Sequence, residues 1–357
     1  MSDIRVGIVG ASPRGGWAAA AHLPALAALD GFTIAAVATT RMESARETAA
    51  RYDVPVALDS WQELVSHRDV DLVVVAVKVP SHAPVLSAAI ANGKHVYCEW
   101  PLGADLGEAE MLTEAALVGG VVHAVGLQGR HAASTRFVRD LIVEGRLGEV
   151  QSVSVVAAAP MNGSRISESL TWATDRSAGV NNLTITGGHV LATLAEMVGE
   201  PSISSGLLRN PHGTAIVTET GREISGLPAN QVVLAGTLPG GAVFSVVVQG
   251  GNPPFASGFH LTVMGTEGQV TVDPAGPPGS LWIADWAIRA RWADGSEEVL
   301  EVPRRYRTTP EEVWAGPAAN VAELYQALGT TLHGGRDRFP DFADAVRLHE
   351  LIAAVES

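Results

Sequence analysis

The residues able to carry out acid–base chemistry stand in three short segments. Glu99 and Trp100 end the apolar stretch of "VYCEWPLG", and Lys78 follows the apolar run "LVVVAV". His189 comes after two glycines in "TITGGHVLATLAEMV". An imidazole gives or takes a proton near neutral pH and a lysine supplies a cation, whereas an indole only donates a hydrogen bond or stacks. We therefore expect a small-molecule site with proton transfer at His189 or Lys78, beside an exposed indole.

The first 127 residues alternate short apolar runs with helical segments. Continuous apolar strands that alternate with helices indicate a parallel sheet covered on both faces. Ligands bind at the carboxyl ends of such strands, so we expect Lys78 and the turn at residues 99–101 to face a cleft. The expected strands cover residues 4–10, 33–39, 70–77, 94–100 and 121–127, and the expected helices cover residues 16–29, 41–52, 82–93 and 106–120.

A glycine-rich segment, "GIVGASPRGGWAAAAH", joins the first expected strand to the first helix. Glycines allow close backbone approach there, and a helix N-terminus offers free N–H groups to a pyrophosphate. The spacing is not a strict G-x-G-x-x-G, because Ser12 stands where the second glycine would be. The segment is either a plain glycine-rich turn or a dinucleotide site, and its place after the first strand favours the dinucleotide site. The cofactor-binding residues expected here are Gly10, Ser12, Arg14, Gly15, Gly16 and Trp17.

The end of the second strand indicates which dinucleotide would bind. An acidic side chain here would bind the ribose 2′-hydroxyl of NAD, but the chain has Thr39, Thr40 and Arg41 at the tip. Hydroxyls and an arginine suit a 2′-phosphate, since a guanidinium binds phosphate through two parallel hydrogen bonds. Alternatively, Arg41 is a solvated residue of the following helix. We expect NADP or NAD as cofactor, with NADP slightly preferred.

Composition excludes several other classes of protein. The net charge of −14 disfavours direct nucleic-acid binding through a broad basic face. Cys98 is the single cysteine, so no intramolecular disulfide is possible, which suits a reducing cytoplasm. No signal-peptide pattern begins the chain, and no apolar run is long enough to cross a membrane. No zinc-like Cys/His spacing, G-x-S-x-G or P-loop motif occurs, so we expect no metal, serine-hydrolase or P-loop chemistry.

The pattern of apolar and polar residues changes after about Arg130. Alternating stretches such as "VQSVSVVAAA" and "AVFSVVVQG", punctuated by glycine and proline, are typical of antiparallel strands. The expected fold class is therefore α/β with two domains. Residues 1–128 form an N-terminal Rossmann dinucleotide-binding domain, and residues 129–357 form a C-terminal α+β domain with a large, mostly antiparallel open sheet.

Four segments in the right order carry a family resemblance over most of the chain. "VGIVG…AHLPAL", "VDLVVVAVKVPSH", "GKHVYCEWPLG" and "GGHVLATLAEMVGE" together resemble the glucose–fructose oxidoreductase / inositol dehydrogenase / rhizopine-catabolism (Gfo/Idh/MocA) family. "RGGWAAAAHLPAL", "CEWPLGADLGEAE" and "GLQGR" resemble the branch that contains the fungal galactose-regulon repressor, which senses dinucleotide and binds a regulatory protein.

The resemblance implies roles for particular residues. In the family a Glu-Lys-Pro turn supplies a lysine that contacts the nicotinamide ribose and helps proton transfer, and a histidine of the second domain is an acid or base. The turn here is Glu99–Trp100–Pro101, so a tryptophan stands at the lysine position while all three residues remain cofactor-binding candidates. The histidine is His189, and the flanking acids of the family pattern fall at Ile185 and Ala192.

Other candidates keep two interpretations each. Trp100 either stacks on a nicotinamide or a sugar, or fills the space of the lysine. Lys78 either supplies the missing cation or is a solvated loop residue. His189 either contacts substrate and acts in acid–base catalysis, or is an ordinary helix residue. The further cofactor candidates are Val77 and His82, and the further substrate candidates are Arg130 and Asn182.

Together, these features favour an NAD(P)-dependent oxidoreductase that acts on a sugar, cyclitol or related polyol by hydride transfer. The alternative is a catalytically degenerate, dinucleotide- or sugar-binding regulatory protein, as the repressor-like segments and the missing lysine allow. The resemblance also implies pairing of subunits through the open sheet, so we expect a homodimer or homotetramer. Its small-molecule partner would be a sugar or polyol.

Overall fold

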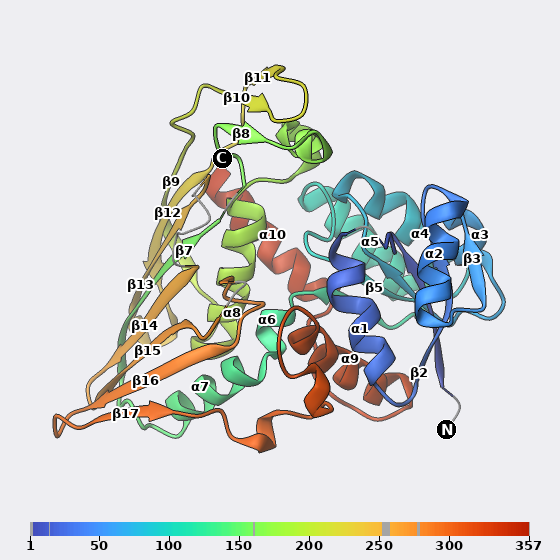
Figure 1. Ribbon diagram of the computed structural model, residues 1–357. Helices are drawn as coiled ribbons and strands as arrows, with labels where there is room; N and C mark the ends of the chain where they lie inside the picture. Colours follow the sequence, from blue (N-terminus) through green and yellow to red (C-terminus); the bar gives the residue numbers. More distant parts are fainter. Residues whose placement is uncertain (1–2, 14, 160, 252–257, 277–278, 357) are drawn as a thin grey trace. The chain divides into compact units, whose positions relative to one another are not determined.

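The computed structural model describes residues 3–13, 15–159, 161–251, 258–276 and 279–356 (Figure 1). The predicted cofactor residue Arg14 lies outside the described residues. The chain forms two compact units. The first contains Met1–His131 and Arg307–Arg347, and the second contains Ala132–Tyr306 and Leu348–Ser357.

The first unit is built on a six-stranded parallel sheet with the strand order β3-β2-β1-β4-β5-β6. This is the order of a doubly wound dinucleotide-binding fold. The short strand β3 was not anticipated from the sequence. The strands are β1 Ile4–Val9, β2 Phe32–Ala38, β3 Val56–Leu58, β4 Leu72–Val75, β5 His95–Glu99 and β6 His123–Gly126.

Helices cover both faces of this sheet (Figure 1). Their starts follow local chemistry, because the side chains of Ser60 and Asp105 accept from the backbone N–H three residues on and so cap α3 and α5. A π-helical turn, η1 Ala18–His22, leads into the first helix. The helices are α1 Leu23–Ala28, α2 Met42–Tyr52, α3 Trp61–Ser66, α4 His82–Ala91, α5 Leu106–Gly119 and α6 Gln128–His131, with a short turn η2 Val79–Ser81 before α4.

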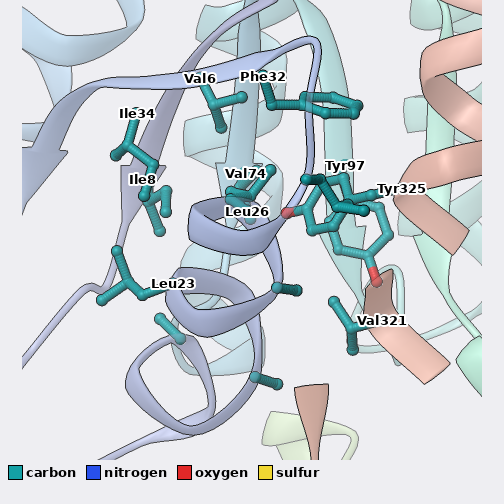
Figure 2. Close-up of a cluster of buried hydrophobic side chains, with 14 of the residues drawn as sticks. Val6, Ile8, Leu23, Leu26, Phe32, Ile34, Val74, Tyr97, Val321 and Tyr325 are labelled. Atoms are coloured by element: carbon teal, nitrogen blue, oxygen red, sulfur yellow. The ribbon is translucent and has the colours of Figure 1, made fainter. Parts of the chain in front are cut away.

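A segment near the end of the chain completes the first unit. Helix α9 Ala318–Leu332 packs on α1, and its Val321 and Tyr325 join the buried cluster that includes Val6, Ile8 and Tyr97 (Figure 2). The predicted division into residues 1–128 and 129–357 did not anticipate that residues 307–347 belong to the first compact unit. Helix α10 Phe342–Glu356 spans the division between the two units.

The second unit is built on an eight-stranded sheet with the order β17-β16-β15-β14-β7-β13-β12-β9. All of its strand pairs are antiparallel except β13 with β7. The predicted fold class, a Rossmann domain plus a domain with a large, mostly antiparallel sheet, is confirmed. The strands are β7 Val150–Ala158, β9 Ser202–Arg209, β12 Gln231–Thr237, β13 Val243–Gln249, β14 Phe259–Gly265, β15 Gly268–Pro274, β16 Trp286–Trp292 and β17 Glu297–Leu300.

One face of the large sheet is covered and the other is open. Helices α7 Ala133–Val143 and α8 Gly188–Val198 lie on the covered face (Figure 1). Alternate residues such as Val153 and Val155 of β7 point to that face and are buried.

A small sheet of β8 Arg165–Ile166, β10 Thr214–Val217 and β11 Glu223–Ser225 is separate from the large one. The short turns are η3 Glu168–Thr174, η4 Arg176–Ala178, η5 Leu183–Gly187, η6 Pro239–Gly241, η7 Arg304–Tyr306 and η8 Glu311–Val313.

Candidate functional site

The glycine-rich turn after β1 has the geometry that a dinucleotide site needs. Gly10 has a φ of 98°, and a Cβ atom there would lie 2.3 Å from the carbonyl oxygen of Ala76, directly after β4. Only glycine therefore fits where these two turns approach each other. Gly15 and Gly16 also have positive φ, and open space surrounds the positions of their absent Cβ atoms. That open backbone lets a pyrophosphate approach the turn closely.

The residue after these glycines offers a hydrogen-bond donor. Trp17 is half-buried, and its indole Nε1 is buried without a partner among the described residues. Buried donors are nearly always paired, so an unpaired one beside a glycine turn suits an acceptor atom of a bound molecule. The turn residues present therefore fit a dinucleotide.

The tip of β2 is closed by local hydrogen bonds. The hydroxyls of Thr39 and Ser44 donate to the carbonyl oxygen of Arg41 at 2.8 and 2.9 Å. Thr40 and Arg41 are exposed, and no acidic residue occupies the tip. Thr39 is thus engaged in the turn itself, whereas the side chain of Arg41 is accessible to a ligand. The preference for a 2′-phosphate stays a prediction.

His82 joins the turns that follow β4 and β5. It is buried, with Nδ1 2.9 Å from the carbonyl oxygen of Pro101 and Nε2 3.1 Å from that of Val77. Burial lowers the pKa of His82. A neutral imidazole has one N–H, so it donates to one of the two carbonyls at a time. His82 therefore lies between the two turns and is hydrogen-bonded to one of them at a time, and the exposed Lys78 follows Val77 directly.

A buried chain of hydrogen bonds fixes the carboxylate of Glu99. His22 Nε2 lies 3.0 Å from Glu99 Oε1, and His22 Nδ1 lies 2.7 Å from the hydroxyl of Tyr325. A carboxylate only accepts, so Nε2 carries the proton and Nδ1 accepts from Tyr325. A Cβ at Gly126 would lie 2.5 Å from Glu99 Oε1, so glycine makes room for the carboxylate. Sequence reasoning missed these partners, although the "AHLPAL" segment contains His22.

Trp100 is buried, with 5% of its surface exposed, so the expectation of an exposed indole was wrong. The peptide bond from Trp100 to Pro101 is cis. A buried indole brings no ionisable group to the turn at which the family resemblance places a lysine. The indole N–H can donate a hydrogen bond, but the ring has no group that exchanges a proton near neutral pH.

His189, in the second unit, is a buried and neutral imidazole. It stands near the start of α8 and stacks on Trp282 with ring centroids 4.4 Å apart and an interplanar angle of 6°. Burial lowers the pKa of His189 to about 3. Its Nδ1 is buried without a partner among the described residues. At neutral pH the ring can exchange hydrogen bonds with a ligand, but it is not a charged acid.

Asn182 belongs to a cluster of buried amides. Its Nδ2 donates to the carbonyl oxygen of Asn230 at 2.9 Å, and Asn230 Nδ2 donates to the carbonyl oxygen of Asn162 at 2.8 Å. Asn182 Oδ1, Asn230 Oδ1 and Asn162 Nδ2 are buried without partners among the described residues. Unpaired acceptors and a donor, all uncharged, suit the hydroxyl groups of a neutral ligand. Local sequence gave no signal for Asn162 or Asn230.

Arg130 already has a partner within the first unit. Its Nη1 lies 2.9 Å from Asp344 Oδ1, and both side chains are buried. Asp344 also binds Arg347. The ion pair links α6 to α10. Each buried charge needs a partner of opposite sign, and the pair supplies one for both side chains. Contact of Arg130 with substrate stays a prediction.

The predicted residues thus fall into two groups. Strand order brings Gly10, Thr39, Val77, Lys78 and Glu99 to the carboxyl edge of one parallel sheet. Asn182 and His189 belong to the second unit.

Among the described residues, no group of three or more His, Cys, Asp or Glu side chains could hold a metal ion. The fold and the glycine turn together define a dinucleotide-binding protein of the Rossmann class.

Comparison with known proteins finds a different family model for each of two parts of the chain. Residues 4–127 match the family described as "Oxidoreductase family, NAD-binding Rossmann fold", and residues 134–274 match "Gal80p, C-terminal domain". The N-terminal part of the chain is therefore similar to the NAD-binding Rossmann domains of this oxidoreductase family, and the part that follows is similar to the C-terminal domain of Gal80p.

Its relatives include both a regulator and sugar enzymes. The galactose/lactose metabolism regulatory protein GAL80 of Saccharomyces cerevisiae is 27% identical over 99% of this chain and 92% of its own. A dTDP-3,4-didehydro-2,6-dideoxy-alpha-D-glucose 3-reductase of Streptomyces violaceoruber is 28% identical over 99% and 94%. A levoglucosan dehydrogenase, solved with NADH and L-sorbose, superposes with a TM-score of 0.83 at 21% identity over 99% and 96%, which shows a shared fold.

The lowered pKa of His189 predicts a pH-dependent contribution to stability. Between its folded pKa of about 3 and the ordinary value of 6.5, the unfolded state binds a proton that the folded state does not. Stability is therefore lost as pH falls below the ordinary value. We expect the unfolding free energy of the wild type, relative to that of His189→Asn, to fall by up to about 1.4 kcal/mol per pH unit in this range.

Urea unfolding at a series of pH values measures this difference. Above about pH 7.5 the imidazole is neutral in both states, so a constant difference there is the internal control. A difference that stays constant from about pH 7.5 down to about pH 4 would show that the imidazole is not held neutral by burial.

Proposed function

We propose that the protein is an NAD(P)-dependent oxidoreductase that acts on a CH–OH group of a sugar, cyclitol or related polyol. The observation that carries this proposal is the turn at Gly10, which only glycine can form and which leads into a helix on a parallel sheet. When bound, the nicotinamide exchanges a hydride with the carbinol carbon. The residues of the chain then bind, orient and exchange the proton.

In this proposal the first unit holds the cofactor. The glycine turn and the following helix bind the pyrophosphate, and Trp17 Nε1 donates to an acceptor of the dinucleotide. The two turns that His82 lies between hold the nicotinamide end, with Glu99 fixed by His22. These contacts orient the cofactor rather than react with it.

The second unit would bind the polyol. The unpaired amide atoms of Asn162, Asn182 and Asn230 suit hydroxyl groups, and the neutral ring of His189 accepts the hydroxyl proton as the hydride leaves. Lys78 supplies a cation at the end of β4. The names of the Streptomyces reductase and of levoglucosan dehydrogenase point to the same substrate class.

Turnover assays test the proposal. We expect reduced nicotinamide to form when the protein is mixed with NADP or NAD and a panel of sugars, cyclitols and polyols, followed by absorbance. His189→Ala should lower kcat/KM at least about 100-fold, because it removes the proton acceptor. His67→Ala, which precedes the amino end of β4 and so lies away from the carboxyl edge of the sheet, is the matched control and should keep wild-type activity. Equal losses in both variants would contradict the role of His189.

A second candidate function is supported by two residues at the proton-handling positions. Trp100 is buried where a lysine is expected, and the pKa of His189 lies at about 3. A protein with these changes could bind dinucleotide and sugar without catalysis, as a regulator. Tight binding of NADP or NAD with no turnover on any polyol of the panel would favour the regulator over the enzyme.

We propose that Arg41 selects NADP over NAD. Its side chain is exposed at the tip of β2, where a 2′-phosphate would lie. Arg41→Ala should weaken NADP at least about tenfold, since hydrogen bonds to charged groups are worth about 1.5–3 kcal/mol. NAD affinity should change less than about twofold, since NAD lacks the phosphate.

Arg46→Ala is the matched control for Arg41→Ala. Arg46 is exposed on α2, the helix that begins directly after Arg41, and its removal changes the net charge equally. Calorimetric titration with each dinucleotide measures the affinities. Equal losses of NAD and NADP in Arg41→Ala, or equal effects of the two variants, would contradict the assignment.

We propose that two copies of the chain pair through the open face of the large sheet. Leu207, Val233, Val247 and Val156 form a row across four adjacent strands on this face. Leu207, Val233 and Val156 are between 39% and 49% exposed. Such an apolar row on a flat sheet suits self-association into a homodimer or homotetramer.

Light scattering after size exclusion tests this pairing. We expect the wild type to be dimeric or tetrameric, and Val233→Arg with Val156→Arg to shift it to monomer, because two charges would be buried at the interface. Leu170→Arg, at an exposed position outside the sheet, is the control. A monomeric wild type would contradict the pairing.

We also propose a cytoplasmic location and no nucleic-acid partner. Cys98 is a buried free thiol whose pKa is raised by burial, as suits a reducing compartment. The net charge of −14 opposes binding to phosphate backbones. Within the described part of the chain, no helix has the length and apolar character to cross a membrane.

A further inference from the structure

A cavity of about 590 Å³ lies entirely within the second unit. It is formed by the end of β9, the loops at residues 210–213 and 226–229, the turn η4 and the last residue of α10. Its volume falls within the range of about 300–1,000 Å³ that is typical of small-molecule sites. None of its lining residues belongs to the unit that contains the glycine turn.

Two arginines give this cavity a positive character. The side chain of Arg176 lines it and has no hydrogen-bond or ion-pair partner among the described residues. Arg209 Nη1 donates to the carbonyl oxygen of Leu208 at 2.8 Å, which leaves its other N–H groups for a ligand. The chain as a whole carries a charge of −14, but the two guanidinium groups make this concave site locally more positive than the rest of the surface. A cavity of this kind attracts anions.

One acidic residue, Glu356, brings a negative charge to the same cavity as the two arginines. Glu356 also lines the cavity, and its Oε1 accepts from Asn181 Nδ2 at 3.0 Å. Asn181 in turn accepts through Oδ1 from the backbone N–H groups of Leu183 and Thr184, at the start of the helical segment that contains His189. The carboxylate is therefore held in place and weakens the binding of an anion by repulsion.

The remaining wall of the cavity is partly apolar. Leu227 and Pro228 line the cavity together with polar groups such as Asn210, which donates from Nδ2 to the carbonyl oxygen of Pro228 at 2.7 Å. A wall of this composition suits a ligand with an organic body as well as a charged group. The planar guanidinium group matches the geometry of both phosphate and carboxylate, because it can donate two parallel hydrogen bonds to either group.

We propose that this cavity is a second ligand site, which binds a small organic phosphate or carboxylate through Arg176 and Arg209. The site is independent of the dinucleotide and of the proposed oxidoreductase activity. Its ligand is an oxyanion with an organic body, and Glu356 limits its affinity.

Calorimetric titration at low ionic strength tests the site with glucose 6-phosphate, citrate and, as the uncharged match, glucose. We expect one or both anions to bind and glucose not to bind at this site. Tighter binding of glucose 6-phosphate would identify phosphate as the preferred group, and tighter binding of citrate would identify carboxylate. The charge-removing double variant Arg176→Gln with Arg209→Gln should weaken binding at least about tenfold. The charge-keeping pair Arg176→Lys with Arg209→Lys loses the paired hydrogen bonds but keeps the charge, so its affinity should fall between those of the wild type and the double glutamine variant.

Two further variants sharpen the test. Glu356→Gln keeps an oxygen for Asn181 but removes the repulsion, so anion binding should tighten about two- to fivefold. The pair Arg51→Gln with Arg68→Gln, at exposed positions of the first unit, removes the same charge elsewhere and should change affinity less than about twofold. Saturation with NADP should leave all of these affinities unchanged.

Three results would overturn the assignment. They are no measurable binding of either anion to the wild type, equal losses in the two double glutamine variants, and binding that survives Arg176→Gln with Arg209→Gln. Melting temperatures verify that the variants fold, which we expect because both arginines are exposed.

Discussion

The imidazole of His22 is the contact on which the candidate cofactor site depends. It donates to the carboxylate of Glu99 at the end of β5 and accepts from Tyr325 of α9, so it joins the first helix, the central sheet and a segment 303 positions away in the chain. Its ring is fully buried. Removing it would leave buried polar groups without partners, at a cost of about 1–3 kcal/mol each. The same contact joins residues 307–347 to the first compact unit, together with the buried cluster that contains Val321 and Tyr325.

Two positions at which the family resemblance places proton-exchanging groups carry uncharged side chains in this protein. Trp100 brings a buried uncharged ring to the turn after β5, and burial holds His189 neutral. Dinucleotide binding needs neither side chain to ionise, because backbone N–H groups and glycines carry it. Proton transfer does need a group that changes charge. The structure therefore supports cofactor binding through geometry, whereas the catalysis that we propose would rest on the neutral ring of His189 and on Lys78.

The sequence was most informative where the determinants are local. Apolar runs and the glycine turn identified the parallel sheet, its carboxyl edge and Gly10, because strand period and backbone freedom depend on neighbouring residues. It did not anticipate the three-residue strand β3, the pairing of His22 with Tyr325 or the amides of Asn162 and Asn230. These depend on contacts between distant segments that leave no periodic pattern. The burial of Trp100 was missed for the same reason.

Binding of a dinucleotide at the glycine turn is tested most directly by titrating the protein with NADPH and NADH while exciting its tryptophans. Trp17 stands in the turn itself, so we expect saturable quenching of tryptophan emission together with sensitised emission from the nicotinamide. Trp17→Phe should remove a large part of both signals. We expect Kd values in the micromolar range, on the order of −8 kcal/mol. No saturable transfer with either dinucleotide up to about 1 mM would contradict a dinucleotide site in this protein.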